Sequence, residues 1–266
     1  MRPIEANFEN TWPEGLLRGL EAHRDALSAF QLERAHIDAA AYEDVMLRIN
    51  RPSNPHQAAW DEALALAEQT TASGHLLGFH ATRLMKHEVE EIKRSGLQPL
   101  SVELLQRRLG AAQKAGALTA EEYRRLFACH QAACENRLGR MAFCFTHAQL
   151  KDEGGVGRLL GSWGGEALYN SHEDDAKTGP LLKGLGSPCI VVAAVGVADI
   201  DTHIEVGERL VNCWCARRAI VTEHRPEFEG KVRTNIPGEN ILRIVRLGDP
   251  EFLALTEHNR WRNPLS

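Results

Sequence analysis

The sequence lacks a run of about 18 consecutive apolar residues, which a helix needs to cross a bilayer, so we expect no transmembrane helix. Its beginning also lacks the positive segment and apolar stretch of a secretory signal. Only six cysteines occur among 266 residues, which does not suggest a disulfide framework. Together these absences predict a soluble protein of the reducing cytoplasm.

An excess of positive charge is missing too. The formal net charge is −5 and the isoelectric point is near 6.2, which argues against non-specific nucleic-acid binding through bulk charge, although a local basic groove stays open. With 43% hydrophobic and 25% charged residues, the composition is that of a globular protein able to bury a core. The length suits one large domain, or a main domain with a helical extension.

Familiar catalytic and metal-binding motifs are scarce. Gly154-Gly155-Val156-Gly157 lacks the Lys-Ser/Thr of a phosphate-binding loop, so we expect an ordinary turn there, and no Gly-x-Ser-x-Gly elbow occurs. One stretch invites a zinc interpretation through five residues, Cys129, His130, Cys134, Cys144 and His147. No paired Cys-x-x-Cys spacing supports it, so we predict no metal site.

Helical periodicity dominates the first part of the chain. Apolar residues recur at three- and four-residue steps over residues 14–50 and again over about 56–70. We therefore expect an N-terminal helical region over residues 1–72 and a main domain over residues 73–266. Further helices are predicted at residues 86–95, 101–115 and 119–136, with Ser101 as an N-cap and a capping box from Thr119 to Glu122.

Strand-like segments follow these helices, with one early exception. The early strand covers about residues 75–84, and later ones are expected at residues 140–146, 189–195 and 241–247. One or two more are predicted within residues 210–221, where Cys213 and Cys215 would share a strand face. Because regular βαβ alternation is missing, we predict an α+β fold.

The early strand carries the strongest functional signal. Alternation places His80 and Thr82 on one strand face and Arg83 at the exit of the strand. A ring nitrogen, a hydroxyl and a cation within four residues suit a site that grips a ribose and a phosphate. The alternative is a histidine and a threonine that serve only the packing of the core or the strand end.

A His-x-Thr on a first strand, followed by a helix that ends at Ile92-Lys93-Arg94-Ser95-Gly96-Leu97, resembles the ADP-ribosyltransferase fold of the diphtheria-toxin and poly(ADP-ribose)-polymerase class. The resemblance covers roughly residues 76–248. It implies a split antiparallel or mixed β-sheet core. It further implies that residues 80–83 (His80, Ala81, Thr82 and Arg83) bind NAD, with His80 and Thr82 on the adenosine-side ribose and Arg83 at the pyrophosphate.

The same resemblance implies the rest of the site. Phe143 lies on a strand similar to the family's second strand, and Tyr169 resembles the tyrosine that stacks on nicotinamide. Glu239, directly before a late strand, resembles the catalytic glutamate, with Glu166 and Glu205 as rivals. His80, Tyr169 and Glu239 would form the catalytic set, while Tyr169 as a plain core aromatic is an equal alternative.

The implied function is transfer of ADP-ribose from NAD, consumed as a substrate, to a macromolecular acceptor. The acceptor would be a protein or a nucleic acid, and the biological role that of a bacterial toxin or defence effector. Two alternatives stay open: an NAD-consuming RNA 2′-phosphotransferase, for which only Arg83 and Arg140 offer the required arginines, and an inactive binding or scaffold domain. The N-terminal helices would inhibit the site, bind a partner or dimerise.

Overall fold

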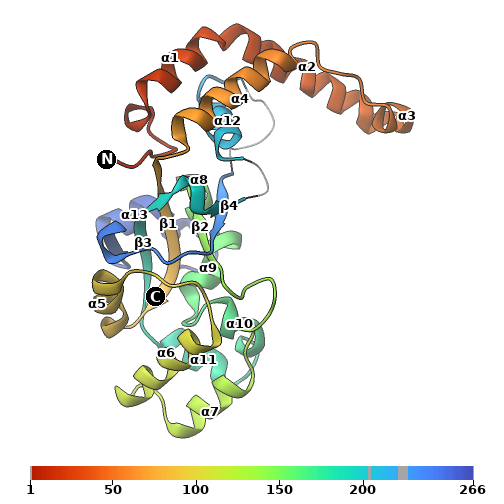
Figure 1. The fold of residues 1–266 in the computed structure, drawn as a ribbon. Coiled ribbons are helices and arrows are strands. Elements are labelled where there is room, and N and C mark those ends of the chain that lie inside the picture. Colours follow the sequence, from red (N-terminus) through yellow and green to blue (C-terminus); the bar gives the residue numbers. More distant parts are fainter. Residues whose placement is uncertain (1, 203–204, 221–226, 266) are drawn as a thin grey trace. The chain divides into compact units, whose positions relative to one another are not determined.

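The computed structural model describes residues 2–202, 205–220 and 227–265 (Figure 1). The chain divides into two compact units. The first unit comprises Met1–Leu76, Gly196–Ala198 and Thr202–Phe228, and the second comprises Leu77–Val195, Asp199–Asp201 and Glu229–Ser266. The first unit therefore holds the expected N-terminal helical region together with a later segment of the chain. Within the described residues, no helix combines the length and apolar character needed to cross a membrane.

The first unit is helical. Its elements are η1 (Glu9–Thr11), α1 (Glu14–Ala22), α2 (Arg24–Glu43), α3 (Val45–Ile49), α4 (Gln57–Thr71) and α12 (Val206–Arg217). The helix predicted over residues 14–50 is thus broken into three. The second break falls at Asp44, whose backbone is extended and whose carboxylate accepts a hydrogen bond from the Met46 amide, so that it caps α3.

Helix α12 shows that the strand prediction for residues 210–221 was wrong as far as Arg217, where the helix ends. Residues 221–226 lie outside the described residues. The buried residues Val206, Leu210 and Trp214 follow at four-residue steps, the period of a helix face. Cys213 and Cys215 are consequently buried on a helix and do not share a strand face. A β-carbon at Gly207 would lie 2.9 Å from the Glu68 nitrogen, so α12 approaches α4 closely.

The second unit is built on a six-stranded sheet with strand order β4-β5-β2-β1-β3-β6. The strands are β1 (His75–Leu84), β2 (Met141–Cys144), β3 (Ser187–Gly196), β4 (Ile200–Asp201), β5 (Glu229–Val232) and β6 (Ile241–Arg246). The pairs β1–β2, β2–β5, β3–β6 and β4–β5 are antiparallel. The α+β fold is confirmed; β4 and β5, with two and four residues, are too short to show a pattern in the sequence.

The second unit also contains eight α-helices in the described residues. They are α5 (Lys86–Ser95), α6 (Val102–Lys114), α7 (Ala120–Ala128), α8 (His147–Leu150), α9 (Glu153–Gly161), α10 (Glu166–His172), α11 (Thr178–Gly184) and α13 (Pro250–Thr256). The N-cap at Ser101 and the capping box at Thr119 are confirmed. Helix α7 is shorter than predicted. The glycines at 154, 155 and 157 lie inside α9, because Asp152 caps this helix just before them; the predicted turn was wrong.

Strand β1 separates two environments. Leu77, Phe79 and Ala81 lie in a core that α8, α9 and α13 also line. The alternate residues, His80 and Thr82, therefore face the other side of the sheet, and both are only half-buried. The alternation of side chains along β1 thus leaves His80 and Thr82 outside the apolar core that Leu77, Phe79 and Ala81 join.

Gly78 shares that second face, and its lack of a side chain is required by packing. A β-carbon there would lie 2.8 Å from Phe143 Cδ1 and 2.9 Å from Val195 Cγ2. We expect Gly78→Ala to lower the free energy of unfolding by about 1–3 kcal/mol through overpacking. Gly110→Ala is the matched control: nothing lies within 4 Å of a β-carbon there, and α6 should gain about 1 kcal/mol. Urea unfolding measures both; equal shifts for the two variants would contradict this account.

Candidate functional site

His80 is held in a defined orientation on β1. Its Nδ1 lies 2.8 Å from the Ala142 carbonyl oxygen on β2, and its ring packs at 5.5 Å against the buried ring of Phe143. Because a carbonyl oxygen only accepts hydrogen bonds, Nδ1 carries the proton. In the neutral ring, Nε2 is therefore left as an acceptor.

The surroundings of His80 favour this neutral form. Burial lowers the pKa of the imidazole, and the positive charge of Arg108 lowers it further, against the opposing effect of the Ala142 hydrogen bond. Thr82 lies two residues further along the same strand face. The site thus offers a fixed acceptor and a hydroxyl side by side.

Arg83 and Ala81 belong to the opposite side of β1. The Arg83 side chain is buried, its Nε donates to the Leu185 carbonyl oxygen at 2.7 Å, and its Nη1 donates to that of Leu160 at 3.4 Å. These bonds tie the strand to two neighbouring segments of backbone. The geometry supports a structural role for Arg83 and gives no support to the predicted contact with a pyrophosphate.

The sequence alone does not predict the buried ion pair that Glu88 forms beside the site. Glu88, at the start of α5, is 5% exposed and accepts hydrogen bonds from Arg108 Nε at 2.5 Å, Trp163 Nε1 at 2.8 Å and the Met85 amide at 2.7 Å. Burial raises the pKa of Glu88, but the charge and hydrogen bonds of Arg108, with the other two donors, outweigh it and the pKa is lowered. Glu88 is therefore a carboxylate.

Arg108, on α6, binds Glu88 and also contacts Trp163. Its guanidinium lies 4.9 Å from the centre of the Trp163 ring, a cation–π contact, while Nε is bound to Glu88. Its Nη2 is buried and has no hydrogen-bond partner among the described residues. The Arg108 side chain as a whole is partly buried, and its charge contributes to the lowered pKa of His80.

Tyr169 lies elsewhere, on α10. It is buried, and the Arg158 guanidinium covers its ring at 4.3 Å from the centroid. Burial, assisted by the charge of Glu166, raises the pKa of its hydroxyl to about 12. The contacts that the described residues show for Tyr169 do not include His80. A nicotinamide ring could stack on the face that Arg158 covers only if that side chain moved.

The three candidate acids differ in their surroundings. Glu239 is exposed in η3 (Gly238–Asn240), directly before β6, with no partner among the described side chains. Glu166 begins α10 and forms an ion pair with Arg137 at 3.1 Å. Glu205 is the N-cap residue of α12 and belongs to the first unit. Glu239 is thus the candidate that is both in the second unit and unpaired.

The cysteines are all free. Four of them are buried, Cys144, Cys189, Cys213 and Cys215. Burial raises the pKa of their thiols to about 11 or 12. Cys129 and Cys134 are exposed beyond the end of α7. Within the described part of the chain, no three His, Cys, Asp or Glu residues are grouped to hold a metal ion.

The comparisons with known proteins add no family: no family model, no curated protein and no solved structure matches this chain. The site must therefore be interpreted from its own geometry.

The lowered pKa of His80 has a consequence for stability. The unfolded chain, with an ordinary histidine pKa near 6.5, binds a proton before the folded chain does. Stability should therefore be constant above about pH 7.5 and fall as the pH drops below about 6.5. We expect His80→Gln to flatten this fall, whereas His36→Gln, at an exposed position of α2, should not. Urea unfolding between pH 8 and 5.5 measures this dependence of stability on pH. An NMR titration midpoint for His80 at or above 6.5 would refute the lowered pKa.

Proposed function

We propose that the second unit is an NAD-dependent ADP-ribosyltransferase that transfers ADP-ribose to a macromolecular acceptor. One observation carries the proposal: a neutral His80, held by the Ala142 carbonyl, stands beside Thr82 on one face of a central strand. A ribose presents two neighbouring hydroxyl groups, which suit an imidazole acceptor and a hydroxyl side by side. The α+β fold with its mostly antiparallel pairings agrees with the resemblance of the sequence to this class.

The proposed reaction needs little covalent catalysis by the protein. The bond between ribose and nicotinamide breaks through an oxocarbenium-like state, because the cationic pyridinium leaves as a neutral ring. A carboxylate near the ribose stabilises the developing positive charge, and Glu239 is our candidate for it. His80 and Thr82 would hold the far end of NAD, so that binding energy there positions the reacting bond. The acceptor then attacks the ribose carbon.

We assign to Arg108 the contact with the pyrophosphate that the sequence suggested for Arg83. Its Nη2 is a buried donor without a partner, and Glu88 fixes the other side of the guanidinium. A buried N–H of this kind is costly unless a ligand completes it. The pyrophosphate of NAD, with its two negative charges, would do so through a charge-assisted hydrogen bond.

The deciding experiment measures nicotinamide released from NAD by the purified chain, with and without cell lysate as a source of acceptor. We expect release by the wild type, and loss of at least a hundredfold in His80→Ala. Thr82→Val removes the hydroxyl at nearly constant shape and should also lose activity, whereas Thr82→Ser keeps the hydroxyl and should retain most of it. Dependence on lysate would indicate the presence of the acceptor.

The same assay distinguishes the acids. Glu239→Gln should abolish release while leaving the unfolding midpoint unchanged, since its side chain is exposed. Glu166→Gln should retain activity, because Glu166 is paired with Arg137. The reverse result would make Glu166 the acid. NAD binding in calorimetry without any release would mean a binding domain, and neither binding nor release would end the transferase proposal.

Arg108 gives a separate prediction. If it binds the pyrophosphate, Arg108→Gln should raise the KM for NAD by about 10–100-fold, the loss expected for a hydrogen bond to a charged group, with a smaller change in kcat. Arg107→Gln is the matched control, because the neighbouring Arg107 is exposed and bonded to Gln98. The NMR midpoint of His80 should move upward in Arg108→Gln alone. An unchanged KM with a shifted His80 midpoint would assign Arg108 a purely electrostatic role.

A further inference from the structure

The first unit ends in an exposed apolar tip at the far end of α2, where α3 follows (Figure 1). We call residues 42–49 the α2–α3 tip. Its large apolar side chains are Tyr42, 79% exposed, Val45 and Met46, each 61%, and Ile49, 70%. Single exposed apolar residues need no explanation, but four within eight residues of chain make this segment a candidate binding surface.

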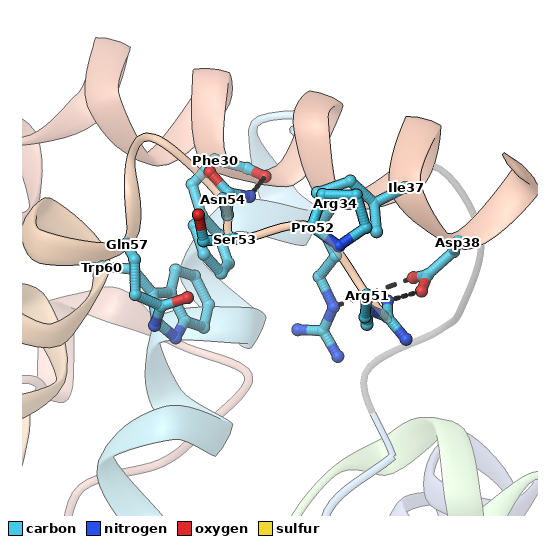
Figure 2. Close-up of a pocket in the computed structure, with 10 residues that line it drawn as sticks. All are labelled: Phe30, Arg34, Ile37, Asp38, Arg51, Pro52, Ser53, Asn54, Gln57 and Trp60. Carbon is cyan, nitrogen blue, oxygen red and sulfur yellow. Dashed lines mark hydrogen bonds and ion pairs between the residues drawn. The ribbon is translucent and has the colours of Figure 1, made fainter. Parts of the chain in front are cut away.

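A pocket of about 450 Å³ opens beside α2 in the same unit (Figure 2). Its apolar part consists of Phe30 and Trp60, whose rings stack at 4.5 Å with an angle of 11°, and of Ile37. All three are buried against their own unit. The pocket thus offers an apolar floor to a side chain from outside.

The rim of the pocket carries surplus positive charge. Arg34 and Arg51 share one carboxylate, that of Asp38: Arg51 forms a close ion pair with it, while Arg34 Nε lies 4.0 Å away (Figure 2). Both arginine side chains are about half exposed. The rim therefore keeps one positive charge and free N–H donors for an anionic partner.

The α2–α3 tip has the opposite character. Glu43 and Asp44 are exposed between the apolar residues of the tip, and neither forms an ion pair among the described residues. Arg48, also in the tip, donates to the carbonyl oxygens of Ala41 at 3.1 Å and Tyr42 at 2.9 Å, so the two carboxylates leave the tip with a net negative charge. Acidic and apolar groups of the tip thus match basic and apolar groups of the pocket.

A chain cannot place its tip on its own pocket floor. Tyr42 follows Phe30 by twelve residues on the continuous helix α2, which holds the two about 18 Å apart along the helix axis. A second copy has no such restriction. Exchange of tips about a two-fold axis would form each complementary contact twice, as in a closed symmetric dimer.

We propose that this chain forms a homodimer in which the α2–α3 tip of each copy occupies the Phe30–Trp60 pocket of the other. Tyr42 and Met46 lie on the apolar floor, and Glu43 and Asp44 face Arg34 and Arg51. The desolvated aromatic and arginine contacts supply most of the affinity. This inference is independent of the function proposed for the second unit.

Sedimentation velocity of the full chain, up to roughly 100 µM, tests the proposal. We expect a wild-type dimer that weakens with salt, and dissociation constants raised at least tenfold in Tyr42→Ser with Met46→Ser, and in Arg34→Glu. His36→Ala, on α2 but outside the tip and the pocket, is the matched control. Circular dichroism checks that each variant is folded.

A charge exchange separates the proposed contact from a general loss of fit. Glu43→Arg alone should weaken the dimer, and Glu43→Arg combined with Arg34→Glu should restore it. A monomeric wild type overturns the proposal, as does a dimer that the tip and pocket variants leave intact or that the exchange does not restore. A monomer that binds neutral phospholipid vesicles through the tip would instead assign this surface to a membrane, and also overturns it.

Discussion

The buried carboxylate of Glu88 is the interaction on which the candidate site depends. It accepts hydrogen bonds from the backbone of Met85, from Trp163 and from Arg108, and so joins the end of β1, the turn before α10 and helix α6. Loss of one partner from such a buried pair costs about 3–5 kcal/mol, a large part of the stability of a typical domain. The same bond fixes Arg108, whose charge adds to the lowering of the His80 pKa that burial causes. Stability and the protonation of the site are thus coupled through one side chain.

The part of the fold that could be predicted from the sequence is the part set by local rules. Alternation on β1 placed His80 and Thr82 on one face, and the apolar run within β3 indicated a strand. The side chains that cap helices, such as Ser101 and Thr119, could be predicted equally well, because the hydrogen bonds they make span only three residues.

What could not be predicted depends on contacts between distant segments. Helix α12 contains β-branched and aromatic residues that favour a strand locally, but its packing against α4 makes it a helix. Glu88 and Arg108 come from different helices, so no motif connects them. Arg83 follows directly after Thr82, yet the pleat turns it to the other face, toward the carbonyl oxygens of Leu185 and Leu160.

The four buried thiols can report when each unit of the chain unfolds. Cys144 and Cys189 belong to the second unit, and Cys213 and Cys215 to the first. With pKa values near 11 or 12 they are protonated and shielded in the folded chain, and they would react with an alkylating reagent only when their own unit unfolds. Mass spectrometry of the labelled peptides would therefore time the two units separately, without any added probe.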